Sequence, residues 1–164
     1  EYVPELPRFG MRMALPQGYT NFTFYGRGPW ENYADRNESS FISLWEQSTS
    51  EQLFPYVRPQ ESGNKTDVRW LELTDNEGVG VRIEGLQPLS VSAMPYRAED
   101  LDPGVESKRQ MHYSDIEPRR EVVLHVDLAQ RGLGGDTSWG ATPRDEYRLT
   151  DDEYSYGYII YPIN

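Results

Sequence analysis

Residues 68–83 of the chain read VRWLELTDNEGVGVRI, and this stretch decides the fold class. Residues 68–74 are rich in apolar, strand-forming side chains, and residues 79–83 alternate between apolar and polar types. Both patterns are typical of β-strands. The polar sequence Asp75-Asn76-Glu77-Gly78 between them is typical of a turn. Together these segments predict an antiparallel hairpin.

Short strands are also predicted on both sides of this hairpin. The clearest is residues 121–128, in which Val122, Leu124, Val126 and Leu128 share one face with a period of two. The other predicted strands are residues 11–15, 19–25, 89–93, 146–149 and 154–161. Short strands separated by Gly, Pro, Asp and Asn turns favour an antiparallel β-sandwich.

Helical signals are few. Asp102-Pro103 resembles an N-cap followed by proline at the first helical position, which predicts two turns within residues 104–111. Residues 34–50 are expected to hold a short helix or an irregular excursion. We therefore expect an all-β fold, with at most two or three short helices, in a single domain spanning residues 1–164.

Composition excludes several classes of function. The chain has 164 residues, with 16 basic and 27 acidic side chains, so it is a poor candidate for nucleic-acid binding. It contains no cysteine and only two histidines, which excludes thiolate chemistry and a multi-histidine metal centre. No apolar run approaches the ~20 residues of a membrane span. The chain begins with Glu1, and we expect that it was excised from a longer protein.

Two polar loops carry candidate binding residues. In residues 26–36, Trp30 and Tyr33 offer aromatic faces for stacking. The alternative is an ordered structural loop in which Asp35 and Arg36 are partners of other protein groups. In residues 55–70, the side chains of Gln60, Glu61 and Asn64 could bind sugar hydroxyls or satisfy the loop's own backbone donors.

A third loop, within residues 126–140, is rich in glycine and ends near Trp139. It lacks the Gly-Lys-Ser/Thr sequence of a phosphate-binding loop. Trp139 has no apolar neighbours in the sequence, so its indole needs a partner, either a sugar or protein surface or the loop itself. His112 and His125 are single histidines in unrelated settings, and neither indicates a catalyst.

Three blocks of sequence give the chain a family resemblance. Residues 25–36, YGRGPWENYADR, resemble the pattern G-x-G-P-x-E-N-Y-x-D-R. Residues 55–64, PYVRPQESGN, match Y-V-x-P-x-E-x-G, and residues 132–139, GLGGDTSW, match G-x-G-G-D-x-S-W. The chain thus resembles the C-terminal domain, or small chain, of the large bacterial β-galactosidases of glycoside hydrolase family 2.

The resemblance implies a fold and a function for the chain. The fold is the C-terminal part of a galactose-mutarotase-like supersandwich. The parent enzymes hydrolyse terminal β-D-galactosides such as lactose with retention, using glutamates on a TIM-barrel domain that also carries Mg²⁺ and Na⁺. This chain lacks that barrel, so it is expected to hold no catalytic residue and no cofactor, and to be inactive alone.

The resemblance also implies which residues meet the substrate. Trp139 is expected to offer an aromatic face to the sugar, and its loop is supported by Gly134, Gly135, Asp136 and Ser138. The expected partners are a β-galactoside and the barrel and other domains of the parent, with self-association also considered. No nucleic acid or membrane partner is expected, and the resemblance allows bacterial cytoplasm or periplasm.

Two other functions remain open from the sequence. A stand-alone carbohydrate-binding module would bind sugar with full affinity without the barrel. A mutarotase-like epimerase would need histidines acting with a carboxylate, and the chain offers only His112 and His125.

Overall fold

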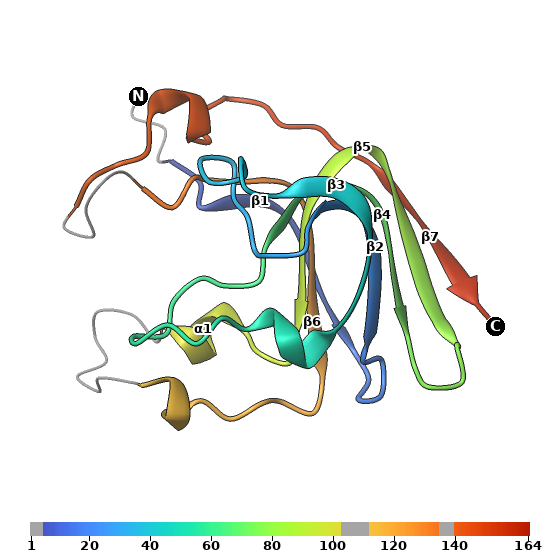
Figure 1. Cartoon of the computed structure of the whole chain (residues 1–164). Helices are drawn as coiled ribbons and strands as arrows, with labels where there is room; N and C mark the ends of the chain where they lie inside the picture. Colours follow the sequence, from blue (N-terminus) through green and yellow to red (C-terminus); the bar gives the residue numbers. More distant parts are fainter. Residues whose placement is uncertain (1–4, 103–111, 135–139) are drawn as a thin grey trace.

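The strands of the computed structural model pair into one seven-stranded sheet in which every pairing is antiparallel (Figure 1). The structure describes residues 5–102, 112–134 and 140–164. The strands are β1 (Arg8–Leu15), β2 (Asn21–Gly28), β3 (Phe41–Ser48), β4 (Lys65–Thr74), β5 (Gly80–Met94), β6 (Val122–Gln130) and β7 (Tyr158–Ile163). Their order across the sheet is β1-β6-β5-β4-β2-β3, and β7 pairs with β5.

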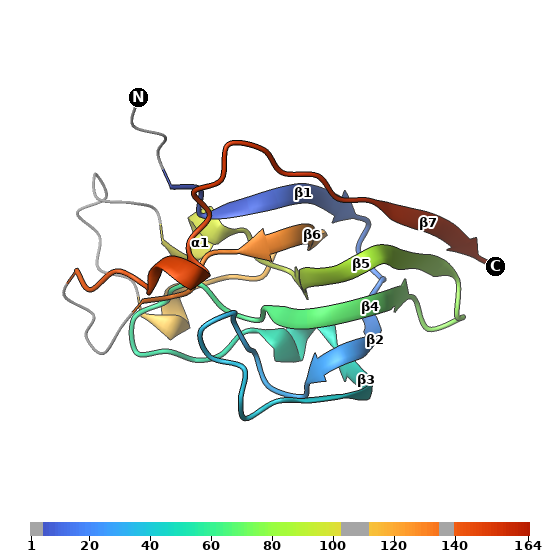
Figure 2. The same cartoon turned by 90° about the horizontal axis from the view of Figure 1, so that it is seen from above.

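The long central strand β5 organises the sheet. One of its edges pairs with β4, and its other edge is divided between two strands. Gly80–Gly85 pairs with β7, whereas Ser90–Met94 pairs with β6 (Figure 2). The predicted strands at residues 79–83 and 89–93 are therefore two parts of one continuous strand.

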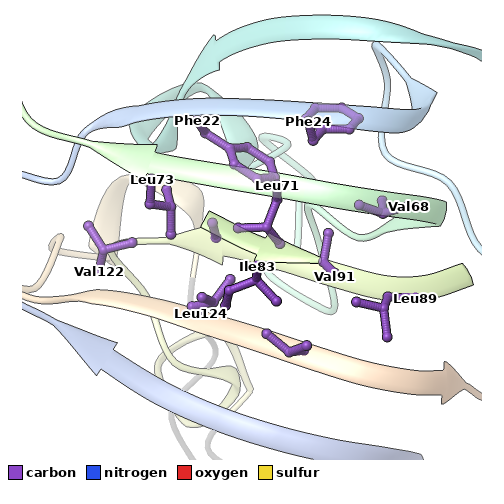
Figure 3. Close-up of a cluster of buried hydrophobic side chains, with 12 residues drawn as sticks. Phe22, Phe24, Val68, Leu71, Leu73, Ile83, Leu89, Val91, Val122 and Leu124 are labelled. Carbon is purple, nitrogen blue, oxygen red and sulfur yellow. The ribbon is translucent and has the colours of Figure 1, made fainter. Parts of the chain in front are cut away.

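The hydrophobic core lies on one face of the sheet. Its buried members come from β2, β4, β5 and β6, and on β6 they alternate along the strand, as the period of two requires. Phe22 and Phe24 of β2 stack at 4.9 Å between ring centroids, and they lie beside Leu71 of β4 (Figure 3). Ile83 of β5 and Leu124 of β6 continue the same buried cluster.

The prediction of an all-β, antiparallel fold with almost no helix is confirmed. Helical segments of the described residues are a single α-helical turn and three short 3-10 segments. They are α1 (Ala98–Leu101), η1 (Thr49–Gln52), η2 (Tyr113–Asp115) and η3 (Asp145–Tyr147). In the part of the chain that the structure describes, no helix is long and apolar enough to span a membrane. The helix predicted within residues 104–111 lies outside the described residues.

Two local predictions are wrong. Residues 34–50 contain strand β3, because the aromatic and β-branched run at Phe41–Trp45 pairs in register with β2. A strand is predicted over residues 146–149, but residues 145–147 form η3, with the Tyr147 amide donating to the Arg144 carbonyl at 2.9 Å. Leu149 makes an isolated bridge with Leu6.

Candidate functional site

The loop that follows β2 folds tightly on itself. The backbone N–H groups of Tyr33 and Arg36 donate to each other's carbonyls at 3.1 and 2.8 Å. The side-chain amide of Asn32 donates through Nδ2 to the carbonyls of Arg27 and Trp30, at 3.0 Å in both cases. These bonds satisfy backbone acceptors that the end of the strand would otherwise leave unpaired. The loop is therefore held in a defined conformation by hydrogen bonds of its own backbone and of the Asn32 side chain.

Glu31 joins this first loop, residues 26–36, to the second loop, residues 55–70. Its side chain is 9% exposed, and one carboxylate oxygen accepts from Arg36 Nη2 at 2.7 Å and from the Tyr56 hydroxyl. The other oxygen accepts from the Gly63 amide at 2.8 Å and from Ser62 Oγ at 3.2 Å. Hydrogen bonds to a charged group are stronger than neutral ones, so Glu31 holds residues 56–63 against the first loop.

A pair of buried asparagines makes a second link between the same loops. The Asn32 backbone N–H donates to the Asn64 carbonyl at 2.8 Å, and Asn64 Nδ2 donates to the Asn32 carbonyl at 2.9 Å. Asn32 Oδ1 accepts from both the backbone and the hydroxyl of Thr66, and Asn64 Oδ1 accepts from Ser90 Oγ at 2.9 Å. Asn64 thus forms hydrogen bonds with the protein's own groups. This agrees with the alternative in which the loop satisfies its own donors and does not bind a sugar.

The beginning of the glycine-rich third loop rests on Asp35 of the first loop. The Gly134 amide donates to Asp35 Oδ2 at 3.1 Å, and the Gly132 amide donates to the Tyr147 carbonyl at 2.9 Å. A Cβ at position 132 would lie 2.7 Å from the Asp35 carboxylate, and Gly134 has φ of +124°. Gly134 therefore has a backbone conformation that favours glycine, and a side chain at position 132 would displace the Asp35 carboxylate. The other carboxylate oxygen, Asp35 Oδ1, is buried and has no hydrogen-bond partner among the described residues.

The predicted site residues have different outcomes. Gly134 is the supporting residue that the structure describes, and it lies at the Asp35 contact. Gly135, Asp136, Ser138 and Trp139 lie outside the described residues, so their role stays a prediction.

The two aromatic residues of the first loop differ in exposure. Tyr33 is fully buried, and burial raises the pKa of its hydroxyl well above the ordinary value. Trp30 is 69% exposed. Only Trp30 of these two can therefore offer a ring face to a ligand.

Residues of the second loop also have defined partners. Glu61 pairs with Arg8 at 3.0 Å, and the same guanidinium pairs with Asp127 at 3.1 Å. Asp127 is 1% exposed, and burial raises the pKa of its carboxyl to about 6 even though Arg8 opposes the shift. Gln60 is exposed.

Lys65 is a buried cation that no sequence pattern indicates. It is 2% exposed, and its Nζ donates to Gln52 Oε1 at 2.8 Å. Burial lowers the pKa of Lys65 to about 8, although the nearby Glu31 carboxylate favours the charged form. Lys65 begins strand β4, next to a polar loop, and such a lysine is usually solvated. Its burial results from the fold, which places Lys65 against Gln52 and in one pocket with Pro29 and Trp30 of the first loop.

The histidines of the chain do not form a site. His125 lies on β6, where burial and the charges of Arg8 and Arg12 lower its pKa to about 4, so it is neutral at pH 7. His112 is exposed and precedes η2. Within residues 5–102, 112–134 and 140–164, no three His, Asp or Glu side chains are grouped to hold a metal ion.

The fold and the joined loops define a class of protein: an all-β domain whose first loop contacts the second loop through Glu31 and the start of the third loop through Asp35. The family model described as "Beta galactosidase small chain" matches residues 1–160. The chain belongs to this family.

Several curated relatives are similar over nearly the whole chain. It is 37% identical to a β-galactosidase of Priestia megaterium, over 99% of the chain. It is 38% identical to the β-galactosidase BgaC of Bifidobacterium adolescentis, over 92% of the chain, and 31% identical to a β-galactosidase of Streptococcus thermophilus, over 99%. The matches cover 15%, 14% and 15% of these relatives, so the chain spans a small part of their length.

Glu31→Gln tests the joint between the first two loops. We expect the free energy of unfolding to fall by ~1.5–3 kcal/mol, because the neutral amide loses charge-assisted bonds. Chemical denaturation measures the change. Glu77→Gln, on the exposed turn of the β4–β5 hairpin, is the control and should change stability by less than ~0.5 kcal/mol. Equal effects of the two substitutions would contradict the role of Glu31.

Asp127→Asn tests the buried carboxyl on β6. Because the folded-state pKa of about 6 lies above the unfolded value of 3.8, the folded protein holds a proton that the unfolded chain releases. This contribution to stability is present at low pH and is lost as the pH rises through 6. The stability of the wild type relative to the variant should therefore fall between pH 4 and pH 7. Asp152→Asn, at an exposed position, is the control and should not change this profile.

Proposed function

We propose that this chain is an accessory domain of a β-galactosidase that contributes the indole of Trp139 to the sugar site. The observation that carries the proposal is the contact between Asp35 and Gly134, which fixes the start of the loop leading to Trp139. The names of the relatives supply the reaction class. The substrates proposed for the parent are terminal β-D-galactosides such as lactose.

The chemical step belongs to other parts of the parent enzyme in this proposal. A retaining glycosidase needs two carboxyl groups ~5–5.5 Å apart across the scissile bond. The family resemblance assigns these groups, and the Mg²⁺ and Na⁺ sites, to a barrel domain outside this chain. We therefore assign no catalytic or metal-binding residue here, and the other domains of the parent are the proposed partners.

The physical contribution of Trp139 is apolar contact. An indole stacked on the C–H face of a sugar buries a few tens of Å², and ~25 cal/mol per Å² then gives ~1 kcal/mol. That free energy corresponds to about a tenfold change in affinity. Anchoring of the loop at Gly134 favours this contact, because a binding group that is positioned before the sugar arrives lowers the entropy cost of binding.

Trp139→Ala tests the aromatic contact in the parent enzyme. We expect KM to rise about tenfold for a β-galactoside, with weaker binding of acceptor sugars, because the stacking surface is lost. Steady-state kinetics measures the change, and thermal unfolding of this chain should be nearly unaffected. A loss of stability of ~3–5 kcal/mol would instead show that Trp139 is a core residue.

Asp35→Ala tests the anchoring of the Trp139 loop. Loss of the acceptor for the Gly134 amide should raise KM more than it lowers kcat, because Asp35 positions the loop and does not touch the reacting atoms. Asp35→Asn keeps an acceptor oxygen and should restore part of the wild-type KM. A purely structural role predicts that both variants lose the same amount of active enzyme, with KM unchanged.

A further inference from the structure

The first loop, β3 and residues 51–56 line a cavity of about 720 Å³ that is open to solvent on one side and that the proposed function does not use. Its walls are mainly apolar and include Pro29, Trp30, Leu53 and Phe54. Trp30 is 69% exposed and Phe54 is 52% exposed, so both rings are accessible. None of the described residues of the glycine-rich loop lines this cavity. Cavities of 300–1,000 Å³ are typical of sites for small molecules.

A chain of hydrogen bonds forms the polar lining of the cavity. Lys65 Nζ donates to Gln52 Oε1 at 2.8 Å, and Gln52 Nε2 donates to Gln47 Oε1 at 3.3 Å. Gln47 Nε2 in turn donates to the Pro29 carbonyl at 3.2 Å. These side chains are held in place by one another, so the polar lining is preorganised.

Lys65 has donor capacity that its described neighbours do not use. An ammonium group has three N–H donors, and Gln52 is its one hydrogen-bond acceptor among the described residues. The ring of Phe24, with its centroid 5.9 Å from Nζ, adds a cation–π contact. Burying an ammonium with so few acceptors is costly, and a ligand oxygen would lower that cost.

Charge determines which class of ligand fits. The exposed carboxylates of Glu46 and Glu51 line the cavity and disfavour an anion. The buried ammonium of Lys65 disfavours a cation. The remaining charged residues of the lining, Arg36 and Glu31, neutralise each other as an ion pair at 2.7 Å. A neutral ligand that carries hydroxyl groups and an apolar face satisfies both conditions, because it can accept from Lys65, donate to carboxylates and stack on an indole.

We propose that this cavity binds a neutral oligosaccharide, with a pyranose ring on Trp30 and a hydroxyl oxygen accepting from Lys65. Gln52 and Gln47 fix the position of the ammonium, and the rim carboxylates accept from further hydroxyls. No described residue of the glycine-rich loop lines this sugar site, and the proposal does not depend on the function proposed for Trp139.

Calorimetric titration of the 164-residue chain with lactose, and with cellobiose as a second neutral disaccharide, tests the proposal. We expect saturable binding at one site, with a Kd of ~1 mM for at least one of them. Trp30→Ala should weaken binding by about tenfold or more, because the stacking face is lost. Leu86→Ala is the matched control, since Leu86 is 71% exposed and does not line the cavity, and it should leave binding unchanged.

Two further variants test the role of Lys65 and the independence of this site from the Trp139 loop. Lys65→Met keeps the apolar stem and should also weaken binding, and thermal unfolding checks that the variant folds. If it does not fold, the comparison of Trp30→Ala with Leu86→Ala still decides the question. Trp139→Ala should leave this binding intact, so a failure of this site and a failure of the Trp139 proposal are distinguishable.

Several results would overturn the proposal. These are the absence of saturable binding with either disaccharide, equal weakening by Trp30→Ala and Leu86→Ala, and loss of binding with Trp139→Ala alone. Hydrogen exchange provides a fourth test, in which residues 29–36 of the isolated chain are compared with the same residues in the longer protein. Strong protection of this loop in the longer protein would show that a protein segment occupies the cavity instead of a sugar.

Discussion

The carboxylate of Glu31, whose side chain is only 9% exposed, holds the first two loops of the domain together. Taking a charge out of water costs several kcal/mol unless hydrogen bonds replace the lost hydration. Here the backbone of Gly63, the hydroxyls of Tyr56 and Ser62, and the guanidinium of Arg36 supply those bonds. Because these donors lie on two loops, the cost of burial is offset only when the loops are together. The arrangement of the first two loops therefore depends on solvating this anion, together with the hydrogen bonds between Asn32 and Asn64.

The contact between Asp35 and the start of the third loop also depends on a carboxylate that accepts a backbone N–H, but it has fewer hydrogen bonds. A carboxylate accepts from the amide of Gly134, and the close approach at Gly132 leaves no room for a side chain. The first loop thus carries two carboxylates, and each one fixes a different neighbouring loop. One short segment after β2 therefore contacts both the second loop and the start of the third, although residues 31 and 134 are far apart in the sequence.

Much of the fold could be predicted, because alternation is a local property of the sequence. The hairpin of β4 and β5 follows from a strand-forming run, a polar turn and an alternating segment, and the strand β6 follows from the period of two in its apolar residues. The sequence pattern does not predict strand β3, because it comes after a polar loop and its residues, Phe-Ile-Ser-Leu-Trp at 41–45, do not alternate between apolar and polar types. It is an edge strand, and Phe41 and Leu44 remain exposed.

The candidate site was harder to predict than the sheet. The sequence blocks indicated which loops matter, but contacts such as Glu31 to Gly63 depend on how the strands bring distant segments together. The burial of Lys65 has no local signal at all, since lysine is ordinarily a surface residue. Its position follows from the pairing of β4 with β5 and from the placement of η1 beside it.

The division of one edge of β5 between β6 and β7 has a consequence for assembly. β7 is bonded along its length to Gly80–Gly85 of β5 and to no other strand of the described chain. If β7 detaches, a row of backbone donors and acceptors on β5 is freed, and the β7 of a second copy can fill it equally well. Such an exchange would join two copies by contacts that already exist within one, so this domain has a ready route to domain swapping.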